Sequence, residues 1–133
     1  MNDALMQGAE QEFVIACIAT VAEYAHQANK GLCEGLGDFS QPDWNDAPDW
    51  QQQSAIDGVV HVLKNPDTTP EQSHKNWMAQ KVRDGWVYGA EKNVELKMHP
   101  CMVSYDKLPE AQRLKDHVYL AVVKHGLKIF MLA

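Results

Sequence analysis

Residues 74–101 read HKNWMAQKVRDGWVYGAEKNVELKMHPC, a stretch that places aromatic rings and histidines among lysines and an arginine. A flat ring can stack on a nucleobase, and Lys or Arg can meet a phosphate. Trp77 and Lys81 stand four residues apart, so they share one face of a helix. This combination predicts a pocket for a nucleotide-like ligand, and we expect Trp77 to line that pocket or a dimer groove. The candidate ligand-binding residues are His74, Trp77, Lys81, Arg83, Trp86, Tyr88, Lys97, His99 and Tyr105.

Two other interpretations of the same stretch are weaker. A metal site built on His99 and Cys101, with His74 or His61, lacks the paired short spacings of zinc ligands. A Cys101 nucleophile with a histidine base shows no orienting residue and no oxyanion device. We therefore expect neither a metal, a cofactor nor an enzyme. Trp86 and Tyr88 can also serve only packing, with the cations left in solvent.

The composition restricts the class of protein. With 133 residues and 45% hydrophobic residues, the chain is long enough for one domain with a real core. A net charge of −6 argues against a duplex nucleic acid partner. The N-terminus lacks a signal-peptide pattern, and the apolar run FVIACIATVA is too short to span a membrane. Three widely spaced cysteines favour reduced thiols in the cytoplasm.

Apolar periodicity and turn residues predict a mainly α fold of about four helices, with a short β element between the third and fourth. The first helix should bury a stripe of Phe13, Cys17, Val21 and Tyr24, with Val14, Ile18 and Ala25 beside it. Thr69 has the position of a capping residue and Gly85 that of a left-handed C-terminal cap. The helices are expected at Glu10 to Glu34, Pro48 to Lys64, Pro70 to Asp84 and Leu108 to Gly126, and the β candidates are WVYG (86–89) and MVSY (102–105).

The fourth helix is expected to bury one apolar side. Its four candidates for that side are Leu114, Val118, Ala121 and Val122.

The order of residues from His74 to Pro109 resembles the RyR domain, the repeat named for ryanodine receptors, in its small prokaryotic and phage form. The matching positions are His74, Trp77, Lys81, Gly85, Trp86, Tyr88, Gly89, Lys97, His99, Pro100, Cys101, Tyr105, Leu108 and Pro109. Ala90 departs from the proline usual there in channel repeats, which affects only the loop. The resemblance divides the chain into a helical extension, 1–72, packed on an RyR-like domain, 73–133, as one compact unit.

The resemblance implies a non-catalytic module. In prokaryotes such domains accompany systems that make or sense nucleotide-derived signals, which implies ligand sensing. Channel repeats occur in pairs and this chain carries one copy, so a pair requires a homodimer. Our leading hypothesis is a module that binds or sequesters an adenine-containing nucleotide or related signal. The alternative is a protein-interaction or assembly domain whose exposed aromatics dock a partner chain.

Overall fold

The computed structural model describes residues 2–130 and 132, the first five of them by their backbone alone. It is mainly α, as expected, with a two-stranded parallel sheet between the third and fourth helices. The helices are α1 (Asn2–Gly35), α2 (Asp49–Lys64), α3 (Pro70–Arg83) and α4 (Glu110–Ile129). The short elements are η1 (Trp44–Asp46), β1 (Val87–Tyr88), β2 (Met98–His99) and η2 (Tyr105–Lys107).

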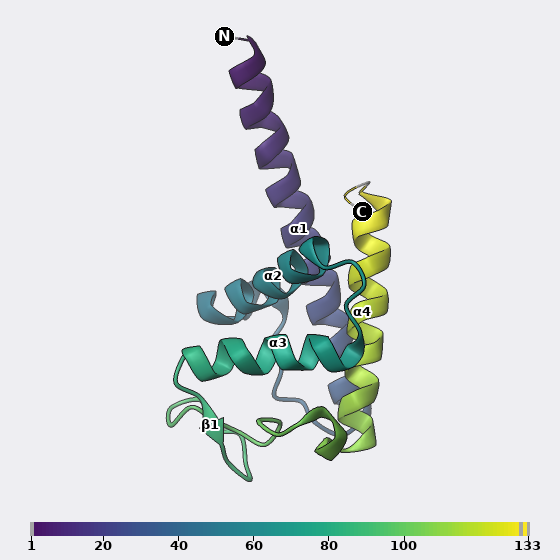
Figure 1. The fold of residues 1–133 in the computed structure, drawn as a ribbon. Coiled ribbons are helices and arrows are strands. Elements are labelled where there is room, and N and C mark those ends of the chain that lie inside the picture. The colour runs from purple at the N-terminus through teal and green to yellow at the C-terminus, as the bar shows by residue number, and fades with distance from the viewer. Residues whose placement is uncertain (1, 131, 133) are drawn as a thin grey trace.

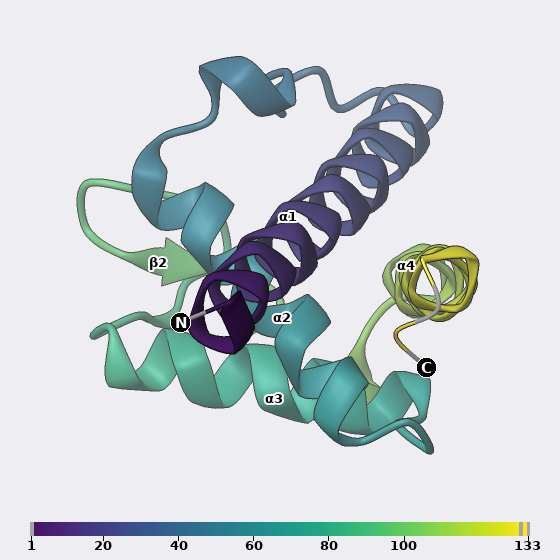
Figure 2. The ribbon, with the colours of Figure 1, turned by 90° about the horizontal axis from the view of Figure 1, so that it is seen from above.

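The two longest helices, α1 and α4, run in opposite directions side by side, while α2 and α3 lie across them (Figure 1). Seen from above, α4 is viewed end-on and α1 is slanted, so the two helices cross at an angle (Figure 2). The core lies where α1, α2 and α4 meet and contains Ile18, Val21, Ala22, Ala25, Val59, Val62, Leu120, Val123 and Leu127. The first turns of α1 extend beyond this core (Figure 1).

The ends of α3 follow their local sequence signals. The Thr69 side chain accepts a hydrogen bond from the Gln72 backbone N–H, and the Gln72 side-chain oxygen accepts one from the Thr69 backbone N–H, so the expected capping box is present. After the helix, Gly85 has a φ of +89°, the left-handed conformation that glycine adopts without strain. These two signals set where α3 begins and ends.

Three predicted boundaries are wrong. α1 begins at Asn2, not Glu10, because its early residues include good helix formers although they lack apolar periodicity. α4 passes through Gly126, since this glycine lets α4 approach α1: a Cβ there would lie 3.0 Å from a methyl group of Val21. The second strand is Met98–His99, not MVSY, because the Val103 carbonyl is used by the His74 ring instead of a strand partner.

The predicted apolar face of α1 is right in part, and that of α4 is wrong. Phe13 and Tyr24 are exposed, and the buried stripe of α1 runs through Cys17, Ile18, Val21, Ala22 and Ala25. On α4, Leu114 is exposed and Val118 half-buried, whereas the fully buried positions are Leu120, Val123 and Leu127. The inward side of α4 is a different side from the predicted one: it presents Asp116 and Tyr119 to a pocket and Leu120, Val123 and Leu127 to the core.

Candidate ligand-binding pocket

A pocket of about 370 Å³ lies between the four helices and the segment that contains β2. Each helix supplies residues to it at steps of three and four, which is the spacing of a single helix face. α1 gives Ala22, Ala25, His26, Asn29 and Cys33; α2 gives Gln51, Ser54, Ala55, Gly58 and His61. α3 gives Ser73, His74, Trp77, Gln80 and Lys81; α4 gives Gln112, Lys115, Asp116 and Tyr119. The lining is therefore built by the whole fold.

The stripes on α1 and α4 change character along their length. The part of α4 near its C-terminus buries Val123 and Leu127 in the core, whereas its first turns present Lys115, Asp116 and Tyr119 to the pocket. The face of each helix thus changes from apolar to polar where it leaves the core. A polar stripe that a sequence pattern would assign to solvent faces the pocket instead.

Aromatic rings form one side of the pocket. The Trp77 ring is stacked near His74, at 5.6 Å between centroids and 24° between planes, and meets His99 edge-on at 5.0 Å. Trp86 is buried and lies 6.0 Å from the ring of Trp50, a residue that is 43% exposed. These separations are within the range of favourable aromatic pairs, so the rings hold one another in place.

Lys81 is the most unusual residue of this wall. It is only 6% exposed, and its ammonium lies 4.9 Å from the Trp50 ring centroid and 5.2 Å from that of Trp86. Within the described part of the chain it forms no ion pair and no hydrogen bond; Asp84 supports its charge only from a distance. Burial therefore lowers the pKa of Lys81, and the two rings compensate the charge only in part.

Two of the four histidines that line the pocket, His74 and His99, have defined hydrogen-bonding roles. His74 Nε2 donates to the Val103 carbonyl at 2.7 Å, since a carbonyl can only accept. His99 Nδ1 accepts from the Cys101 backbone N–H at 3.0 Å, so its proton is on Nε2. Burial, aided by Lys92 and Lys81, lowers the pKa of His99 to about 4. His99 is thus a neutral ring at pH 7 that offers one N–H donor.

Five of the nine residues proposed from the sequence line this pocket: His74, Trp77, Lys81, Trp86 and His99. The other four are not part of its lining. Arg83 and Tyr88 are exposed, and Tyr105 packs its ring 6.2 Å from that of His74. Lys97 donates from Nζ to the Asp84 carbonyl at 2.7 Å, so it closes the C-terminus of α3.

Sequence reasoning missed the contributions of α1, α2 and α4. Asn29 of α1 lines the pocket, whereas the neighbouring Lys30 pairs with Glu34 at 2.6 Å. Asp116 and Tyr119 gave no signal by residue type. Asp116 stands four residues after Gln112 and three before Tyr119, so the three share one helix face. This spacing was the available clue, but it also fits a solvated face.

The cysteines and histidines of the pocket show no arrangement typical of catalysis or metal binding. Burial raises the pKa of the Cys101 thiol, and the basic nitrogen of His99 is already occupied by a backbone N–H. In residues 2–130 and 132, no group of three His, Cys, Asp or Glu side chains is placed to hold a metal ion. Neither feature favours Cys101 as a nucleophile with His99 as its base.

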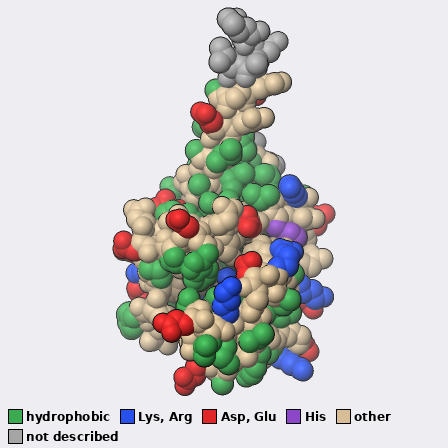
Figure 3. All heavy atoms as spheres, turned by 90° about the vertical axis from the view of Figure 1, so that its left-hand side faces the viewer, with side chains coloured by type: hydrophobic (Ala, Val, Ile, Leu, Met, Phe, Trp, Pro, Cys, Tyr) green, Lys and Arg blue, Asp and Glu red, His purple; other side chains and the backbone are tan. Residues whose placement is uncertain are grey.

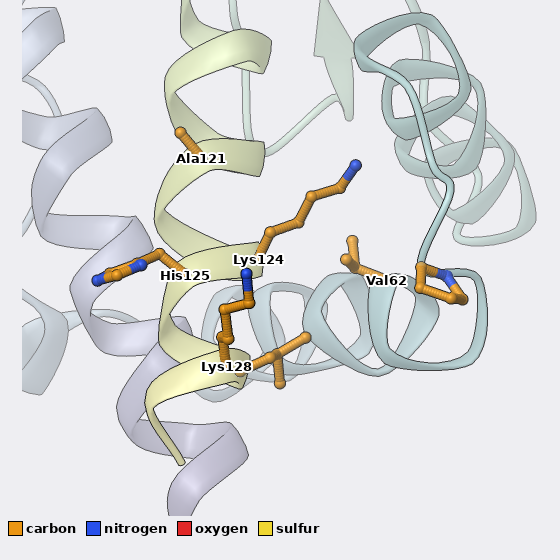
Figure 4. A pocket seen from close by; sticks show the side chains of 7 residues that line it. Val62, Ala121, Lys124, His125 and Lys128 are labelled. Atoms are coloured by element: carbon orange, nitrogen blue, oxygen red, sulfur yellow. The ribbon is translucent and has the colours of Figure 1, made fainter. Parts of the chain in front are cut away.

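A second groove of about 370 Å³ lies between α2 and α4. Figure 4 shows Val62 on one wall and Ala121, Lys124, His125 and Lys128 on α4. Lys124 donates from Nζ to the Thr68 carbonyl at 2.8 Å. This groove contains no aromatic residue apart from His125, and its two lysines are exposed.

On the face shown in Figure 3, acidic and basic side chains are interspersed with hydrophobic ones, and no basic band crosses it. In the part of the chain that is described, none of the helices combines the length and the apolar character needed to cross a membrane.

The pattern of His, Trp, Lys and the His-Pro-Cys segment that surrounds the pocket agrees with a comparison to known families. The family model of the RyR domain matches residues 60–132, which is more than half of the chain. The match begins inside α2, earlier than the resemblance noted from residue 73, and so includes part of the second pocket-lining helix. This protein belongs to the RyR domain family.

Proposed function

We propose that this RyR domain is a non-catalytic module that binds, and so senses or sequesters, a nucleotide-like small molecule in the pocket between its four helices. An adenine-containing nucleotide or a signal derived from one fits the lining best. The protein would act in the cytoplasm, because its three cysteines are all unpaired.

The observation that carries the proposal is the ammonium of Lys81. A buried charge without an opposite charge costs stability, and proteins retain such groups mainly where they serve a function. An anionic group in the pocket would supply the missing partner and a charge-assisted hydrogen bond. Phosphate is the anion that this geometry suggests, since Lys is a common point-charge partner of phosphate.

The aromatic wall supports a planar group next to that anion. Trp77 is half-buried and Trp50 is partly exposed near the same ammonium, so ring surface remains for a base. Stacking of one base on an aromatic side chain is worth about 1–3 kcal/mol. The neutral His99 ring adds an N–H donor for a base or phosphate oxygen.

The lack of catalysis is part of the proposal. A thiol whose pKa is raised is a poor nucleophile, and His99 cannot act as its base while Nδ1 accepts from the backbone. Binding without chemistry suits the sensing or capture of a signal, as expected of the small prokaryotic and phage members of the family.

The test is calorimetry with adenine and guanine nucleotides, as mono-, di- and cyclic phosphates, on wild type, Lys81→Gln and Trp77→Ala. Removal of a charge-assisted hydrogen bond costs about 1.5–3 kcal/mol, so Lys81→Gln should weaken binding roughly ten- to a hundredfold. Lys75→Gln is the matched control, because Lys75 lies on the same helix, is exposed and pairs only with Glu71 at 3.8 Å.

Two results would refute this function. One is a wild-type protein that binds none of these nucleotides at micromolar concentration. The other is equal loss of affinity in Lys81→Gln and Lys75→Gln, which would mean that Lys81 acts only through the net charge of the protein and not by contact with the ligand.

The alternative function, docking of a partner chain or a second copy, is favoured by exposed apolar residues. Val87 and Tyr88, which form β1, are 55% and 57% exposed, and Phe39 is 75% exposed. Light scattering distinguishes the two functions: a dimer that Tyr88→Ser dissociates, in a protein without nucleotide affinity, would support an assembly domain.

A further inference from the structure

Asp116 is the second unsatisfied charge of the pocket. It comes from α4, after the last residue of the sequence motif, Pro109, and it lines the pocket. Its Oδ2 atom is closed off from solvent and has no hydrogen-bond partner in the described structure. Among the side-chain oxygens and nitrogens of that part of the chain that are fully closed off from solvent, it is the only one without a partner; the Lys81 ammonium, although it belongs to a buried residue, is not among them. Buried polar groups are nearly always satisfied, so this atom requires an explanation.

The groups around Asp116 do not supply a partner. His74 from α3 and His117 and Lys115 from α4 itself favour its charged form, and Tyr119 lies nearby on the same helix. None of them donates a hydrogen bond to Oδ2. Burial outweighs their charges and raises the pKa of Asp116 to about 6. At pH 7 the carboxylate is therefore largely ionised, yet one of its oxygens is unpaired.

The buried lysine of the same pocket does not supply a partner either. Lys81 lines the same pocket from α3, but it forms no ion pair with Asp116 in the described structure. The pocket thus holds a cation and an anion on different helices, each incompletely satisfied. An occupant that carries both an anionic group and a hydrogen-bond donor would satisfy both.

We propose that Asp116 selects the ligand by accepting hydrogen bonds from its donor groups, while Lys81 receives the anionic end. This inference rests on the proposed function and narrows it. A carboxylate is the group that commonly binds the hydroxyls of a nucleotide ribose, and it also accepts from the amino group of a base. The ligand class is a phosphorylated nucleoside with a free hydrogen-bond donor. Inorganic phosphate alone would pair only with Lys81, and an uncharged nucleoside only with Asp116.

The test compares wild type, Asp116→Asn and the exposed control Asp67→Asn, with adenosine 5′-diphosphate as the probe. The Asn side chain keeps the shape, loses the charge and keeps a single acceptor oxygen. Affinity for the probe should fall tenfold or more in Asp116→Asn and stay unchanged in Asp67→Asn. Without ligand the melting temperature should move the other way: Asp116→Asn should melt above wild type, because a buried unpaired charge is gone.

Two analogues identify the donor. The 2′,3′-dideoxy form lacks the ribose hydroxyls, and inosine 5′-diphosphate lacks the amino group. The analogue without the relevant donor should bind wild type weakly and lose no further affinity in Asp116→Asn, as in a double-mutant cycle.

The outcomes separate this inference from the function on which it rests. If wild type binds no nucleotide, both fail. If wild type binds and Asp116→Asn binds equally well, the role of Asp116 fails while the nucleotide pocket stands. If Asp116→Asn melts below wild type without ligand, the carboxylate has a partner within the protein and the inference is overturned.

Discussion

The protein contains two hollows of equal volume, each about 370 Å³, that differ in how their charges are satisfied. In the groove between α2 and α4, Lys124 donates to the Thr68 carbonyl and the other cations are exposed. In the pocket between the four helices, Lys81 and one oxygen of Asp116 are buried without such partners. Volume therefore does not distinguish the two hollows. The unsatisfied charge favours the pocket as the proposed binding site, because an occupant could compensate that charge.

The largest expected effect is a loss of stability in the core that leaves the pocket unchanged. Leu127 lines the groove and is 1% exposed in the core, so Leu127→Ala should lower the free energy of unfolding by about 2–5 kcal/mol. Urea denaturation measures this loss. Nucleotide affinity of the folded fraction, measured by calorimetry in the same sample, should be unchanged. A parallel loss of affinity would show that the groove and the pocket are coupled.

A second change acts inside the pocket. Gly58 on α2 faces Tyr119 on α4, and a methyl group at position 58 would collide with the tyrosine hydroxyl. Overpacking of this kind costs about 1–3 kcal/mol, so Gly58→Ala should destabilise the fold and displace Tyr119 from its place in the pocket lining.

The chain offers a matched control for this substitution. Gly8 lies in α1 with nothing near the position of an added methyl group. Gly8→Ala should therefore raise the free energy of unfolding by about 0.5–1 kcal/mol through helix propensity alone. In urea denaturation, the free energy of unfolding should fall in Gly58→Ala and rise in Gly8→Ala. A change in the same direction for both variants would contradict the steric argument.

How well the sequence predicts the surroundings of a residue depends on whether its contacts lie within its own segment or on other helices. His74, Trp77 and Lys81 were found because an ordered motif of distinctive residue types marks them. Asp116 was missed because an acidic residue on a helix is usually solvated, and only the packing of three other helices buries it.

The error in the apolar face of α4 has the same origin. Leu114 is as apolar as Leu120, but it lies 55% exposed on the outer side of α4. The inner side of the helix faces the pocket in its first turns and the core in its later turns. The capping box of α3 was predicted correctly because all its hydrogen bonds are local. Local signals could be read from the sequence, and the tertiary surroundings of a helix face could not.

The pH dependence of stability provides a third, smaller test of the comparison between the pocket and the groove. The pKa of Asp116 is raised from 3.8 to about 6 in the folded protein, so the folded state holds the proton more tightly. The stability contributed by this group is present below about pH 4 and is lost as the pH rises to about 6.

Because Asp116 is partly exposed, solvent screening reduces this loss to about 1 kcal/mol. Urea denaturation at several pH values should show that wild type loses this amount relative to Asp116→Asn between pH 4 and 6. A constant difference between the two proteins would mean that Asp116 does not titrate in this range.

The smallest expected effect concerns the groove. Lys124→Met removes one hydrogen bond to the Thr68 carbonyl at an exposed position, so it should lower the free energy of unfolding by about 0.5 kcal/mol. Removal of charge thus weakens the fold at Lys124 but strengthens it at Asp116. Thermal denaturation of both variants without ligand checks this reversal of sign.

The unpaired charges of the pocket also bear on how long the protein persists in a cell. A ligand that binds only the folded state lowers the unfolded fraction by mass action, and proteases degrade the unfolded fraction. The unsatisfied charges of Asp116 and Lys81 destabilise the empty protein, so the proposed ligand, by compensating them, would extend the lifetime of the folded molecule. The amount of this protein would then follow the concentration of what it binds, without any change in its synthesis.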